Sequence, residues 1–144
     1  MTFLESDGGK IILSVAIAFT IAQILKGVIY SINNYNSSWQ QRLKIFVSNG
    51  GMPSGHAAMV AALLTAVIKV AGVNSIDFAL ALVIALLVVH DAVTVRRAVG
   101  INAKILKETA RLKPVKVVEG HSYIEAAVGI VLGIAIASIY LAIV

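Results

Sequence analysis

Residues 123–144 read YIEAAVGIVLGIAIASIYLAIV, with Glu125 as their one charged side chain. A run of this length, at about 1.5 Å of helix per residue, nearly crosses a hydrocarbon core of about 30 Å. Three more apolar runs precede it, from Ile11 to Ile32, from Ala57 to Val73 and from Ile76 to Val95. The sequence therefore predicts an all-α integral membrane bundle of four transmembrane helices.

The composition of the whole chain agrees with this prediction. Of the 144 residues, 59% are hydrophobic and 13% are charged, and the mean hydropathy is +0.92. Helices over about 11–32, 54–73, 76–97 and 121–144 use up the chain, so we expect a single transmembrane domain over residues 1–144. The absence of cysteine excludes disulfides and thiolate metal sites.

The distribution of positive charge predicts the orientation. Four spans place the 33–56 and 96–122 loops on one membrane face, and that face carries nine Lys and Arg residues against two, Lys10 and Lys69, on the other. The positive-inside rule then puts the loops in the cytoplasm and both termini outside a plasma (inner) membrane. The net charge of +5 fits a membrane surface as partner, and no nucleic-acid recognition module surrounds these cations.

The cationic segment from Asn102 to Lys113 carries an imperfect stripe of apolar residues. One interpretation is a short interfacial helix in the 96–122 loop. A solvated basic loop is the other.

Titratable residues gather at the cytoplasmic ends of the expected helices. Such groups are costly in a membrane and call for an explanation. They are Lys26, His56, His90, Asp91, Arg96, Arg97, His121 and Glu125. The alternation of the loops places all of them at one membrane depth.

Helical spacing adds direction to this layer. Small residues recur every four positions before Lys26, and Glu125 is followed at the same spacing by Gly129 and Gly133. Both stripes favour close helix packing and would turn Lys26 and Glu125 inward. The alternatives are that Lys26 snorkels to the interface and that the glycines serve a homo-oligomer.

Residues 50–56, GGMPSGH, form the most specific local motif. Ser54 is a natural N-cap, and Gly55 lets an anion approach the first turn of the helix, where N–H groups and the helix dipole favour phosphate. His56 would stand at the edge of this pocket. An ordinary helix cap followed by a lone histidine is the plainer interpretation.

His121 and Glu125 have the i, i+4 spacing that lets a carboxylate hold one imidazole nitrogen and leave the other free to attack phosphorus. Arg96 and Arg97 bring planar forks suited to phosphate oxygens. Asp91 could support one of these cations, or it could form a purely structural ion pair.

Taken in order, three motifs resemble a divergent small-membrane-protein branch of the type-2 phosphatidic acid phosphatase and vanadium haloperoxidase superfamily. They are GGMPSGHAA from residue 50, HDAVTVRRAVG at 90–100 and GHSYIE at 120–125. The resemblance implies that His121 attacks phosphorus to form a phosphohistidine, that Glu125 orients it and that His56 protonates the leaving oxygen. It further implies phosphate binding by Lys26, Arg96 and Arg97, with no metal or other cofactor.

Some features depart from the superfamily pattern. Asn33 stands where an arginine followed by proline would close the first signature, and Arg97 lies 24 positions before His121 instead of a few. Four helices are also fewer than the usual six.

The expected function is a membrane phosphatase for a lipid phosphate or pyrophosphate. A non-catalytic protein that binds or transports anionic headgroups is an alternative, because binding requires only the cations and the helix terminus. A histidine and carboxylate metal site is a third.

Overall fold

The computed structural model describes residues 3–34, 51–109 and 121–144, and every regular element among them is helical. The expected all-α fold class is confirmed. In chain order the elements are η1 (Phe3–Glu5), α1 (Asp7–Asn33), α3 (Gly55–Ala71), α4 (Ile76–His90), the π-helical turn η2 (Asp91–Val95), α5 (Arg96–Thr109) and α6 (Tyr123–Ile143).

Within the described ranges, three helical stretches are long and apolar enough to cross a membrane. They are α1, the continuous stretch Ile76–Leu106 and α6, while α3 is a shorter apolar helix of 17 residues. At about 1.5 Å per residue α3 is about 26 Å long, somewhat shorter than a hydrocarbon core of about 30 Å. The chain is therefore an integral membrane bundle of four helices.

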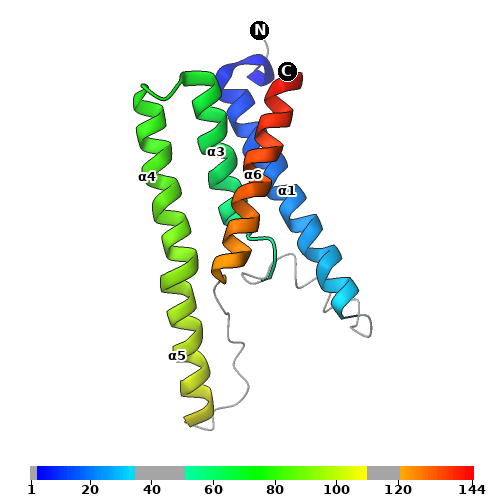
Figure 1. Ribbon diagram of the computed structural model, residues 1–144, viewed down its shortest axis with the longest axis vertical. Coiled ribbons are helices and arrows are strands. Elements are labelled where there is room, and N and C mark those ends of the chain that lie inside the picture. Colours follow the sequence, from blue (N-terminus) through cyan, green and yellow to red (C-terminus); the bar gives the residue numbers. More distant parts are fainter. Residues whose placement is uncertain (1–2, 35–50, 110–120) are drawn as a thin grey trace.

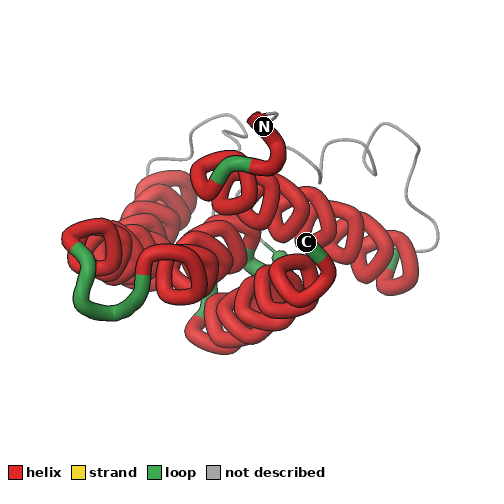
Figure 2. The backbone as a smooth tube through the Cα atoms, turned by 90° about the horizontal axis from the view of Figure 1, so that it is seen from above, coloured by secondary structure: helices red, strands yellow, loops and turns green. Residues whose placement is uncertain are grey.

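Helix α3 lies at the centre of the bundle and contacts α1, α4 and α6, with its largest contact against α6. Both termini lie at the same end, where the Lys10 ammonium donates to the Val144 carbonyl at 3.1 Å (Figure 1). Seen from that end, α4 stands at one side of the bundle, joined to α3 by a short loop (Figure 2). The opposite end brings together the C-terminus of α1 and the N-termini of α3 and α6.

Small residues allow the close contact between α3 and α6. A Cβ on Gly129 would come within 2.4 Å of the Ser54 carbonyl oxygen, and one on Gly133 within 2.2 Å of the Ala58 carbonyl oxygen. Both distances are far below van der Waals contact, so only glycine permits this approach. The Gly129 and Gly133 stripe therefore packs inside this chain.

The small stripe of α1 also faces the core, as its spacing predicts. Ser14, Ala18 and Ala22 are fully buried, and Lys26 at the end of the stripe is 3% exposed. The snorkelling alternative for Lys26 is wrong, because its side chain is enclosed by the protein.

The third expected helix, over 76–97, has no end at Arg97. Helix α4 changes to a π-helical turn at Asp91 and runs on as α5 to Thr109, in nearly the same direction (Figure 1). The short helix expected in the 96–122 loop is therefore present as α5, continuous with a transmembrane helix. The rest of that loop, residues 110–120, lies outside the described residues.

Candidate functional site

Among the described residues outside the helices, His121 is the most deeply buried titratable side chain, at 2% exposure. Its backbone N–H donates to the Ala92 carbonyl in η2 at 3.2 Å, which ties the residue to the end of α4. Its Nδ1 atom lies 3.3 Å from Oε2 of Glu125. Because Nδ1 faces the carboxylate, Nε2 is the ring nitrogen left for chemistry.

Glu125 is held by a capping box at the start of α6. Its Oε2 atom accepts from the Ser122 backbone N–H at 2.9 Å, while the Ser122 hydroxyl accepts from the Glu125 N–H at 3.3 Å. One carboxylate oxygen thus serves both the helix cap and the imidazole. This arrangement fixes the carboxylate before any ligand binds, so the histidine is oriented by the fold itself.

The start of α3 is joined to the same place. Ser54 is fully buried, its hydroxyl accepts from the Ala57 N–H at 3.4 Å, and its own N–H donates to the Glu125 carbonyl at 3.0 Å. The N-termini of α3 and α6 therefore meet beside His121. The first turn of α3, with Gly55, points the positive end of its dipole at this position.

Lys26 reaches the same place from α1. It lines a pocket of about 280 Å³ together with Tyr30, Gly51 and Glu125, and residues Ile29, Asn33, Asn34 and Met52 complete the lining. Gly51 has φ of +92°, and a Cβ there would lie 3.5 Å from Cγ of Lys26. The turn before α3 therefore packs along the lysine stem.

Burial lowers the pKa of His121 below its ordinary value of 6.5. The hydrogen bond and charge of Glu125 oppose this shift, and the charges of Lys26 and His56 add to it. The three groups therefore act on His121 from α6, α1 and α3. Because the imidazole is kept neutral near neutral pH, it is available as a nucleophile.

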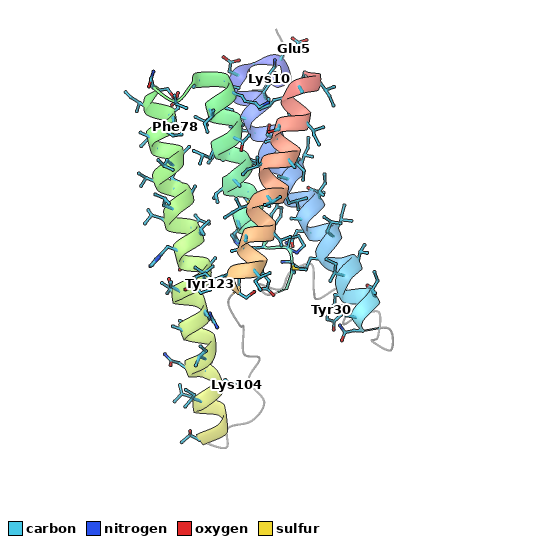
Figure 3. The ribbon with its side chains drawn as sticks, in the orientation of Figure 1. Glu5, Lys10, Tyr30, Phe78, Lys104 and Tyr123 are labelled. Atoms are coloured by element: carbon cyan, nitrogen blue, oxygen red, sulfur yellow. The ribbon has the colours of Figure 1, made fainter. Side chains whose placement is uncertain are left out.

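Of the other predicted site residues, His56 is half-buried in the first turn of α3. Arg97 is exposed, with its guanidinium carbon 5.9 Å from the centroid of the Tyr123 ring. Figure 3 shows Tyr123 and Tyr30 toward the end of the molecule opposite Glu5 and Lys10. Asp91 is half-buried in η2, and the Arg96 side chain lies outside the described part of the structure. Phosphate binding by the two arginines stays a prediction.

The structure adds two residues that we did not expect. The carboxamide carbon of Gln23 lies 3.7 Å from the Cβ position of Gly55, beside the first turn of α3. Its i, i+3 relation to Lys26 was the available signal. Ser122 was visible in the sequence as the first residue of a Ser-x-x-Glu capping box.

Among the described residues, no group of three or more His, Asp or Glu side chains could hold a metal ion. The metal-site hypothesis therefore has no supporting cluster of ligands within those ranges. The His121 imidazole is instead oriented by Glu125, the His56 imidazole and the Lys26 ammonium lie near enough to act on its pKa, and the start of α3 is bonded to α6. Those are the groups that phosphoryl transfer to a histidine requires.

Comparison with known proteins gives an independent result. Residues 8–136 match the sequence model of a family described as the Divergent PAP2 family. The chain is also 35% identical over 97 residues to the uncharacterized membrane protein YuiD of Bacillus subtilis (strain 168). That alignment covers 67% of this chain and 59% of the relative, so the chain spans less than two thirds of the relative's length. No solved structure matches the chain significantly.

Proposed function

The chain belongs to the Divergent PAP2 family, and from this premise we propose that it is a membrane hydrolase that removes phosphate from a lipid phosphate or pyrophosphate. The observation that carries the proposal is the contact between His121 Nδ1 and Glu125 Oε2 at 3.3 Å, buried beside the N-terminus of α3. Because the carboxylate holds Nδ1, the proposal assigns the attack on phosphorus to Nε2.

In the proposed reaction, Nε2 of His121 attacks phosphorus. An N–P bond forms and the P–O bond to the lipid breaks, while His56 donates a proton to the leaving oxygen. Glu125 accepts the Nδ1 proton in a hydrogen bond and stabilises the imidazole as it becomes positively charged. Water then attacks phosphorus and gives a proton to His56, the N–P bond breaks and inorganic phosphate leaves. Both histidines thereby return to their starting protonation states.

The cations would stabilise the charge that develops on the phosphoryl oxygens. Lys26 is buried at the site, and the first turn of α3 offers the backbone N–H of Gly55, while the Ser54 N–H donates to the Glu125 carbonyl and fixes that turn beside α6. Arg96 and Arg97 are candidates to bind the headgroup as it enters, with Asp91 in a supporting role. In this proposal the reaction needs no metal cofactor.

We propose that the protein lies in the inner membrane and that its site faces the cytoplasm. The nine Lys and Arg residues of the two loops on the site side support this orientation, and the two on the other side are Lys10 and Lys69. The substrate would then be a lipid of the cytoplasmic leaflet.

The test measures phosphate release by the purified full chain from phosphatidate, phosphatidylglycerophosphate and polyprenyl diphosphate. We expect turnover that resists chelator, falls with orthovanadate and is lost in His121→Ala and His56→Ala. His90→Ala is the matched control, because His90 is an exposed histidine on α4, and it should keep full activity.

Other results would assign another function. Headgroup binding without phosphate release from any of the three lipids would indicate a binding or transport protein. Turnover that chelator abolishes would indicate metal chemistry.

A further inference from the structure

Helix α5 presents an apolar face that no described residue covers. Val99 is 60% exposed and Leu106 is 62% exposed, and Ile101 and Ile105 are each more than half exposed. At 100° per residue these side chains and Val95 fall on one broad side of the helix. A transmembrane helix exposes such residues to lipid. Helix α5, however, extends past the start of α6, so it lies beyond the packed part of the bundle (Figure 3).

The opposite side of α5 is cationic. Arg97 and Lys104 are exposed, and the sequence places Arg96 and Lys107 in the same 14 residues, against a single acid, Glu108. A helix with one apolar and one basic side lies in the interface of a membrane, and its cations attract anionic headgroups. Because α5 follows a transmembrane helix without a break, it stays within reach of that interface.

The junction between the two helices provides a place to bend. Residues Asp91–Val95 form a π-helical turn, and π turns are a recognised cause of helix kinks. Helix α5 as a whole makes no large contact with α1, α3 or α6. Ala92 and Val93 are buried, and the Ala92 carbonyl accepts from the His121 N–H, whereas Val95 at the end of η2 is exposed. A bend at Val95 would lay α5 along the membrane surface and leave the packed bundle in place.

We propose that α5 is a docking element for the anionic phospholipids of the leaflet on the site side, with its apolar side inserted and its cations on the headgroups. Charge complementarity selects this occupant, because anionic headgroups pair with the basic side of α5, whereas a second copy on the apolar side would leave those cations without an anionic partner. The inference holds whether or not the site hydrolyses phosphate.

The chain contains no cysteine, so a single introduced cysteine carries a fluorescent label at one known position. We would label Val99→Cys on the apolar side of α5, Lys104→Cys on the basic side, and Leu86→Cys as a lipid-facing control in α4. The full-length protein would be reconstituted into phosphatidylcholine vesicles with and without phosphatidylglycerol. Accessibility to an aqueous quencher is then measured.

In anionic vesicles we expect the label at 99 to be protected and the label at 104 to be accessible. Protection at 99 should be lost in phosphatidylcholine alone and in about 1 M salt, where charges are screened within about 3 Å. Adding Arg97→Gln and Lys104→Gln to the 99 variant should weaken insertion about 30-fold. The label at 86 should stay protected throughout, which shows that the bundle is folded.

Three results would overturn the proposal. The label at 99 could be accessible in both kinds of vesicle, or equally protected in both, so that anionic lipid makes no difference. Efficient disulfide formation between two Val99→Cys chains would assign the apolar face to a second copy instead.

Discussion

Helices α6 and α4 both pack against α3, but in different ways. Helix α6 meets α3 through glycines whose missing Cβ atoms leave the backbones almost in contact. Between α4, α3 and α6 lies an apolar groove of about 500 Å³, lined by residues that include Val60, Leu64, Ala85 and Val89. The tight contact is the one that carries the candidate site, since the Ser54 N–H donates to the Glu125 carbonyl across it.

The largest expected effect comes from filling the tight contact. Gly133→Ala would force a Cβ to within 2.2 Å of the Ala58 carbonyl oxygen, so the helices must separate. We expect a loss of about 3 kcal/mol of stability, measured by thermal unfolding in detergent. Phosphate release should fall about a hundredfold, because the two helix starts move apart.

Ala135→Val on the exposed side of α6 is the matched control and should change neither quantity. A Gly133→Ala protein as stable and active as the wild type would show that the close approach is not needed.

The next largest effect is expected at the N-cap residues of α6 and α4. Ser122 caps α6 and Ser75 caps α4, and each hydroxyl accepts a backbone N–H. Alanine at either position should cost about 1 kcal/mol of stability. Turnover should fall in Ser122→Ala alone, because loss of the hydroxyl releases the Glu125 N–H and loosens the first turn of α6, in which the Ser122 backbone N–H holds the carboxylate that orients His121.

Thermal unfolding and phosphate release, measured side by side on both variants, decide this. Equal turnover in Ser122→Ala and Ser75→Ala would mean that the capping box does not position the histidine.

The pH dependence tests the burial that the tight contact creates. Since the pKa of His121 is lowered in the folded protein, the unfolded chain binds its proton more tightly. The contribution of the buried, neutral His121 to the free energy of unfolding is therefore complete above about pH 6.5 and is lost as the pH falls below that value. The acid limb of turnover should lie below the same value, because the attacking imidazole must be neutral.

An NMR titration of the histidines, assigned with His121→Ala, His56→Ala and His90→Ala, measures this directly. A pKa for His121 above the ordinary value would contradict the expected burial.

The smallest effect is expected in the loose contact. Ala85 lines the groove, so Ala85→Leu adds volume where space exists. We expect a change within about 0.5 kcal/mol and unaltered turnover. Thermal unfolding of Ala85→Leu is compared with that of Gly133→Ala. A comparable loss of stability in both variants would show that α4 packs as tightly as α6.

Much of this protein followed from its order of residues alone. Four apolar runs predicted the helices, because lipid requires each spanning segment to satisfy its own backbone hydrogen bonds. The four-residue spacing before Lys26 and after Glu125 predicted which sides are buried, and the spacing of His121 and Glu125 predicted that they meet. These are local properties, and the helical period is sufficient to derive them.

The tertiary structure decided what local periodicity cannot. Spacing within one helix could not show that Lys26 is enclosed, that the glycines pack against α3, or that Gln23 lies beside Gly55, because each depends on how separate helices approach one another. Local spacing also could not show that α4 continues through a π turn into α5. The backbone hydrogen-bond pattern changes between Asp91 and Val95, but no proline or glycine stands there to indicate it. The candidate site exists because the starts of two helices meet beside a third, and only the packed bundle determines that.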